Sequence, residues 1–210
     1  MINLNVKYLS DAYIASVADS FLKENSVESI PVNIERIIEF NYRMDIVPVP
    51  SLQAAFDIEG CSAFDFSAIF VDQYVYEQRY NRYRFTLAHE LAHKVLHQEY
   101  YKKMEFFSIS EWANVVEQID ENDRSKMEYQ AYAFAGLILV PPKFLRTEFE
   151  EQLHLFKPQI EQAQSNDISR DDYLNTVVDG IAYILSTKFK VSTGVLSRRI
   201  KNDCLEQEIG

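Results

Sequence analysis

The sequence contains an H-E-x-x-H motif, formed by His89, Glu90 and His93, inside an apolar stretch whose periodicity favours a helix. On a helix, side chains four positions apart lie on one face, about 6 Å apart along the axis, so the two histidines can bind one metal ion. Glu90 follows the first histidine, where its carboxylate can reach a water molecule at the metal without itself being a ligand. The motif therefore demands a helix here, and it is typical of zinc hydrolases in which the glutamate is the general base.

A hydrolytic zinc site needs a third protein ligand. His97 cannot supply it, because it lies about 12 Å along the helix axis from His89. We therefore expect a carboxylate, and the best candidate is Glu128, which opens an apolar helix that stops at Pro141-Pro142. A carboxylate on a buried helix needs compensation, which a zinc ion, an N-terminal helix-dipole contact or an arginine would supply. The alternatives in the preceding segment are Asp120, Glu121 and Asp123.

Three separated segments share features with one known family. Residues 82–97 contain R-F-T-L-A-H-E-L-A-H, residues 128–141 read E-x-x-A-x-x-F-A followed by I-L-V-P, and residues 181–200 form an apolar-periodic tail. Together they resemble the ImmA/IrrE-type zinc metallopeptidases, which are H-E-x-x-H peptidases that cleave helix-turn-helix repressors. The resemblance covers most of the chain.

The resemblance implies that His89, His93 and Glu128 hold one Zn²⁺ ion and that Glu90 is the catalytic residue. It also implies a protein substrate, namely a helix-turn-helix transcriptional repressor of a phage or mobile element. One departure concerns Tyr132, which stands where the family usually has asparagine. Any contact made by that asparagine must be replaced or absent here.

The order of the predicted elements is that of an α+β protein. Helices are predicted over residues 11–23 and from the capping residue Asn33, and short strands near residues 44–49, 62–66 and 68–76. We expect a mainly helical single domain over residues 1–205, in which a small sheet of about three strands packs on the H-E-x-x-H helix. Its parts are helices and sheet 1–98, an insertion 100–127, the second metal helix 128–140 and a helical tail 142–205.

Two segments are candidates for substrate handling. Residues 67–74 are the expected edge strand, on which an extended peptide could bind by strand addition. The insertion 100–127 predicts a short helix capped by Ser110, and it is either a lid over the cleft or a surface connection docked on the body.

The net charge of −11 makes nucleic-acid binding by the whole chain unlikely. A basic cluster in the tail, formed by Arg198, Arg199 and Lys201, follows a helix-turn-helix-like pattern with Ser192 as a helix cap. The favoured interpretation is that this tail packs within the fold. The alternative function is a non-proteolytic regulatory protein- or DNA-binding module that retains the metal fold.

The chain lacks an apolar run of the roughly 20 residues that a bilayer crossing requires. Its first residues also lack a basic region followed by an apolar segment. We therefore expect a cytoplasmic protein without a membrane partner.

Overall fold

The computed structural model describes residues 1–209, and the chain divides into two compact units. Unit 1 comprises Met1–Val27 and Asn33–Ile138, and unit 2 comprises Glu28–Val32 and the chain from Leu139 onward. Most residues are helical, and three short strands form one mixed sheet, which confirms the expected α+β class. The assignment of residues 1–205 to a single domain stays a prediction. None of the helices within residues 1–209 combines the length and apolarity needed to cross a bilayer.

The sheet lies in unit 1 and has the strand order β1-β3-β2, with β1 (Asp45–Val49) parallel and β2 (Gly60–Ser62) antiparallel to β3 (Ala68–Asp72). The prediction that residues 67–74 form an edge strand is therefore wrong, because β3 pairs on both sides. After β2 the chain turns back through Ala63–Phe66, where the N–H of Phe66 donates to the carbonyl of Ala63 at 2.9 Å. This tight reversal places β3 between its neighbours and leaves β2 at the edge.

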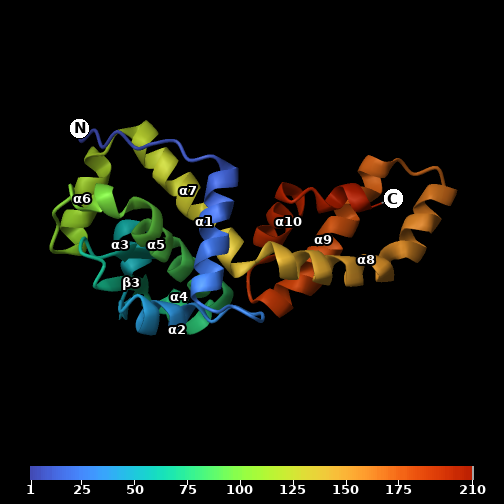
Figure 1. Ribbon diagram of the computed structural model, residues 1–210, viewed down its shortest axis with the longest axis horizontal. Helices are drawn as coiled ribbons and strands as arrows, with labels where there is room; N and C mark the ends of the chain where they lie inside the picture. The colour runs from blue at the N-terminus through green and yellow to red at the C-terminus, as the bar shows by residue number, and fades with distance from the viewer. Residues whose placement is uncertain (210) are drawn as a thin grey trace. The chain divides into compact units, whose positions relative to one another are not determined.

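Helices surround the sheet in unit 1 and make up most of unit 2 (Figure 1). Those of unit 1 are α1 (Asp11–Glu24), α2 (Ile34–Arg36) with the π-helical turn η1 (Ile37–Asn41), α3 (Leu52–Phe56), α4 (Gln73–Gln78), α5 (Tyr80–Tyr101), α6 (Ile109–Gln118) and α7 (Glu121–Leu139). Those of unit 2 are α8 (Pro142–Ser165), α9 (Arg170–Phe189), α10 (Thr193–Asn202) and the short 3₁₀ helix η2 (Leu205–Glu208).

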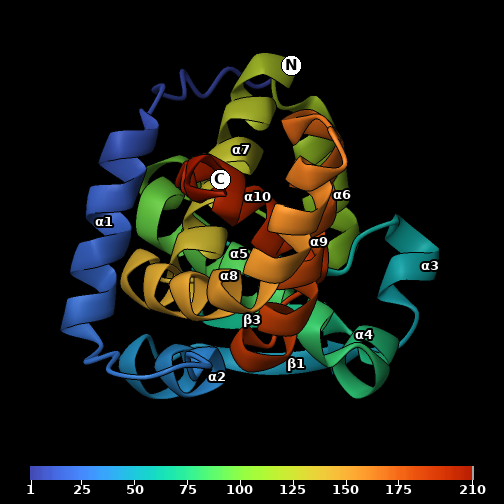
Figure 2. The same ribbon diagram turned by 90° about the vertical axis from the view of Figure 1, so that its right-hand side faces the viewer.

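The long helix α5, which carries the H-E-x-x-H motif, lies over the sheet and contacts both β2 and β3 (Figure 2). The approach is closest at Gly60, where an added Cβ would lie 2.6 Å from the Cγ2 atom of Thr86 and 3.7 Å from the Cγ atom of Glu90. Only a residue without a side chain fits between strand and helix at this point. The glycine thus allows β2 to run directly beside the motif.

Side-chain caps fix where several helices begin. The predicted cap Asn33 is confirmed, since its side chain accepts from the N–H of Arg36 at 3.1 Å. The predicted cap Ser110 is wrong: α6 begins two residues earlier, and Ser108 accepts from the N–H of Glu111 at 3.2 Å. Both serines suit a cap, but only Ser108 has the extended backbone that a cap needs.

One carboxylate of α7 binds three backbone groups of the N-terminal segment. The buried side chain of Asp123 accepts the backbone N–H groups of Leu4, Asn5 and Val6 at 2.9, 2.8 and 3.0 Å. Asp123 was an alternative metal ligand from the sequence, but these contacts use both of its oxygens. Its position instead ties residues 4–6 to a helix more than a hundred residues away.

Replacing Asp123 with alanine is expected to destabilise the protein by about 3 kcal/mol, because three backbone donors lose a charged acceptor. Urea unfolding monitored by circular dichroism measures the change. Asp123→Asn keeps one acceptor oxygen and should cost less. An Asp123→Ala variant as stable as the wild type would mean that the segment is held by other contacts.

Unit 2 is a helical assembly in which α9 contacts both α8 and α10 (Figure 1). Ser192 caps α10 as expected, accepting from the N–H of Val195 at 3.3 Å. In the basic cluster, Arg199 is buried and its Nη2 lies 2.7 Å from Oδ2 of Asp203, while Lys201 donates to Asn175 at 3.3 Å. These two cations are engaged within unit 2, which agrees with a packed tail.

Candidate metal centre

The predicted metal helix forms as a single uninterrupted element. Neither glycine nor proline occurs in α5, so its backbone hydrogen bonds continue through the motif. His93 and Glu90 are buried and His89 is half-buried. The Nε2 atoms of the two histidines lie 3.3 Å apart, as their spacing of one helical turn requires.

The third predicted ligand, Glu128, lies beside this pair. Its Oε2 is 3.2 Å from Nε2 of His89 and its Oε1 is 3.8 Å from Nε2 of His93. The helix begins at Glu121, so Glu128 lies within α7 and does not open the helix as expected. The alternative Asp120 is occupied at the start of α7, where it accepts from the N–H groups of Asn122 and Asp123.

The donor set fits a tetrahedral ion. One ligand atom from each of His89, His93 and Glu128 lies within 4.8 Å of the other two. Nitrogen and oxygen ligands at about 2.0–2.1 Å from a tetrahedral zinc would be about 3.3 Å from one another. The 3.3 Å between the two histidines and the 3.2 Å from His89 to Oε2 of Glu128 are close to that value, whereas the 3.8 Å to His93 is measured from the other carboxylate oxygen, Oε1. Two imidazoles and one carboxylate are also a ligand combination found in hydrolytic zinc enzymes.

The charges of the three groups are arranged for a cation. The Glu128 side chain is exposed; partial desolvation opposes its ionisation, but its hydrogen bond with His89 and the charges of the histidines outweigh this and lower its pKa to about 2. Burial likewise disfavours protonation of His89, yet the contact with Glu128 raises the pKa of His89 above its ordinary value. Burial lowers the pKa of His93 well below the usual range. At neutral pH the site therefore offers a carboxylate and a neutral His93.

Metal affinity is expected to fall as the pH is lowered, since the proton on His89 competes with the metal for the same nitrogen. The raised pKa of His89 moves this competition toward neutral pH. Below that pKa the affinity should drop about tenfold per pH unit. Competition with a chromogenic chelator between pH 5.5 and 8 measures this, and an affinity independent of pH would contradict the ligand role of His89.

A chain of hydrogen bonds from His93 through His97 and Gln130 to Lys7, here called the relay, orients the His93 ring. Nδ1 of His93 lies 3.0 Å from Nδ1 of His97, and Nε2 of His97 lies 2.9 Å from Oε1 of Gln130. The amide nitrogen of Gln130 donates to the carbonyl of Lys7 at 2.9 Å. Because that carbonyl can only accept, the Gln130 oxygen faces His97, whose Nε2 must carry a proton. His97 Nδ1 then accepts from His93, which leaves the lone pair of His93 Nε2 toward the other ligands.

Gln130→Leu, which removes the end of this relay, is expected to weaken metal binding about 10–100-fold, the usual cost of losing an outer partner of a ligand. Gln130→Glu keeps an acceptor for His97 and should retain most of the affinity. Chelator competition on both variants gives the measurement. Equal affinities for the leucine variant and the wild type would show that the His93 tautomer does not depend on Gln130.

Glu90 projects from α5 toward β2. The hydroxyl of Ser62 donates to Oε2 of Glu90 at 3.0 Å, and both side chains are buried. Burial raises the pKa of Glu90 to about 7, so near neutral pH this carboxyl can both accept and release a proton. Ser62 and Gln130 are the contacts that sequence reasoning missed, since an isolated serine or glutamine carries no spacing signal. Tyr132, at the family's asparagine position, packs on Phe85 with ring centroids 4.8 Å apart.

Comparisons with known proteins add three findings. Residues 69–201 match the Peptidase_M78 family, described as the IrrE N-terminal-like domain. Among solved structures, the chain is similar to a "Mycobacterium tuberculosis transcriptional regulator", with a TM-score of 0.51 and 14% identity. That similarity shows the fold alone, and it covers 92% of this chain but only 47% of the regulator. A search of curated proteins finds no match.

Proposed function

This chain belongs to the Peptidase_M78 family of IrrE N-terminal-like domains, and from that membership we propose that it is a zinc-dependent endopeptidase. One observation carries the proposal: the buried carboxyl of Glu90, held by Ser62, lies on α5 beside three donors that could hold a metal ion. If the two histidines and Glu128 only formed a structural ion pair, the site would not need Glu90 as an additional carboxyl. A hydrolase does need a general base at that place.

In the proposed mechanism, His89, His93 and Glu128 would hold the ion, and His97 keeps His93 in the tautomer that can bind it. A bound zinc ion supplies a Lewis acid that polarises the scissile carbonyl and increases the acidity of water. Glu90 takes a proton from the attacking water and gives it to the leaving amine as the peptide bond breaks. Ser62 holds one oxygen of the Glu90 carboxyl in place through its 3.0 Å hydrogen bond.

We propose that the substrate is a helix-turn-helix repressor of a phage or mobile element, cleaved in the cytoplasm to release its target genes. The support for this substrate is the family resemblance of the metal-binding helices and the tail. A narrow substrate range also suits a peptidase that shares its compartment with other folded proteins.

The test is to incubate the zinc-loaded chain with a helix-turn-helix repressor encoded beside its gene, and separately with peptides from a digested proteome. Mass spectrometry of both reactions should find new termini that disappear with 1,10-phenanthroline and return when zinc is added. A zinc-replete protein that binds the repressor but cuts neither sample would instead support the non-proteolytic regulatory module.

A further inference from the structure

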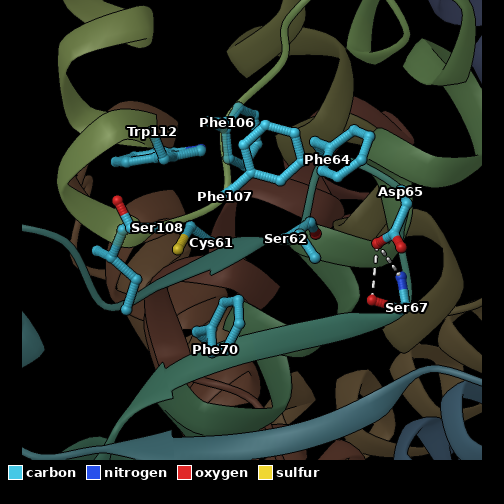
Figure 3. Close-up of a pocket in the computed structure, with 12 residues that line it drawn as sticks. Cys61, Ser62, Phe64, Asp65, Ser67, Phe70, Phe106, Phe107, Ser108 and Trp112 are labelled. Carbon is cyan, nitrogen blue, oxygen red and sulfur yellow. Dashed lines mark hydrogen bonds between the residues drawn. The ribbon is translucent and has the colours of Figure 1, made fainter.

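A pocket of about 450 Å³ lies in unit 1 between the outer part of the sheet and the start of α6 (Figure 3). Aromatic rings dominate its walls: Phe64, Phe106 and Phe107 gather at one side, and Phe70 of β3 faces them from the other. The Phe64 ring centroid is 6.1 Å from that of Phe106 and 5.3 Å from that of Phe107. The volume is in the range of pockets that take small organic groups.

Two contacts join this pocket to the candidate metal centre. Ser62, one of its lining residues, donates its hydroxyl hydrogen bond to Glu90. On the other side, Phe106 of the pocket packs on Tyr101 with ring centroids 6.4 Å apart, and the Tyr101 ring lies 5.7 Å from that of His93. The pocket is therefore one side chain away from both the proposed base and a proposed metal ligand.

The edge of β2 runs along the same region. Glu59 and Ala63 form hydrogen bonds with Asp72 and Ala68 of the neighbouring chain segment, at 2.8 and 2.9 Å. Because hydrogen-bonded pairs alternate in an antiparallel ladder, Cys61 bonds to β3, and the N–H and C=O groups of Gly60 and Ser62 face away from it. That edge is not paired with any strand within residues 1–209. Ser62 is fully buried and Gly60 is half-buried, so an extended peptide can reach this edge by strand addition at its Gly60 end.

We propose that this pocket is a specificity site that takes one large apolar side chain, aromatic or long aliphatic, of a peptide lying along the β2 edge. The inference rests on the proposed peptidase function and adds to it the class of residue near the cleaved bond. Burial of an apolar side chain against the ring-lined walls is favourable. The carboxylate of Asp65, which also lines the pocket, disfavours an acidic side chain.

The fluorescence of Trp112 can report peptide binding, because Trp112 is the single tryptophan of the chain and lines the pocket. Two blocked pentapeptides serve as probes, acetyl-Ala-Ala-Phe-Ala-Ala-amide and the same peptide with aspartate in place of phenylalanine. Titrated into zinc-loaded Glu90→Gln protein, the phenylalanine peptide should change Trp112 emission and bind at least about tenfold more tightly than the aspartate peptide. Equal binding, or no response to either peptide, would overturn the proposal.

A second experiment fills the pocket by mutation. Ala63→Phe and Ile109→Phe each add bulk to a lining residue, and Asn114→Phe adds a ring to an exposed position of α6 outside the pocket. Circular dichroism checks that each variant folds. Two filling variants are used so that the test still stands if one of them does not fold. Both should abolish the preference for phenylalanine, while Asn114→Phe keeps it. A preference unchanged by both filling variants would exclude this pocket as its source.

Digestion of a proteome-derived peptide mixture separates this inference from the proposed function. Zinc-loaded wild type should cut next to large apolar residues, and Ala63→Phe should shift the cuts toward small ones. Cleavage with no apolar preference would leave a peptidase but refute the specificity pocket. A phenylalanine preference in binding without any cleavage would leave the pocket and refute the peptidase.

Discussion

Replacing Glu90 with glutamine is expected to reduce peptide cleavage by about 10²–10⁴-fold, the contribution typical of a positioned general base. The amide has nearly the same shape, but it cannot take up the proton of the attacking water. Because Glu90 is not one of the three donors spaced for the ion, the zinc content should stay near one per chain. The measurement is the rate of cleavage of the repressor or peptide mixture, alongside elemental analysis of the same sample.

The matched control for that substitution is Glu99→Gln, which makes the same chemical change at an exposed glutamate of α5. It should leave both cleavage and zinc content unchanged. If Glu90→Gln retained wild-type cleavage, water would have to be activated without this carboxyl. If it retained a biological effect while cleaving nothing, the function would lie in binding.

Replacing Glu128 with alanine is expected to have the largest effect on metal content. The site would keep two imidazoles, and the affinity should fall by more than the roughly 10–100-fold that an outer partner costs. Elemental analysis after dialysis should find near one zinc per wild-type chain and little in the variant. Chelator competition then gives the ratio of the two affinities.

Glu121→Ala is the control on the same helix, because Glu121 is exposed and was an alternative ligand from the sequence. It should bind zinc like the wild type. A Glu128→Ala protein with undiminished zinc would mean that another carboxylate completes the site. Loss of zinc in Glu121→Ala alone would reverse the assignment of the two glutamates.

Sequence reasoning located the two histidines because local periodicity controls where helical side chains point. The H-E-x-x-H spacing predicts one face of a helix, and that is how His89 and His93 lie. For Glu128, the residues alone left several carboxylates open, and the resemblance favoured one of them. The structure distinguishes them by their partners, since the two oxygens of Asp123 are taken by backbone N–H groups.

What the sequence did not predict depends on contacts between distant segments. Alternation of apolar residues marks a strand but not its neighbours, so β3 was assigned to the edge although it lies in the centre. Ser62 and Gln130 act only through what they touch, and no local pattern distinguishes them from other polar residues. The cap of α6 was misplaced because Ser108 and Ser110 differ in backbone conformation, not in chemistry.

The attachment of the N-terminal segment to α7 also determines when the candidate metal centre can form. Leu4 and its acceptor Asp123 are 119 residues apart in the sequence, and Lys7 is 123 residues from Gln130. Such distant partners meet only after a long loop has closed, which makes their pairing a slow and late step of folding. During synthesis, the first seven residues must wait for α7 to emerge before the relay behind His93 is complete. A nascent or prematurely terminated chain that ends before α7 therefore lacks both Glu128 and the relay, and binding of the proposed ion would report that unit 1 has folded as far as α7.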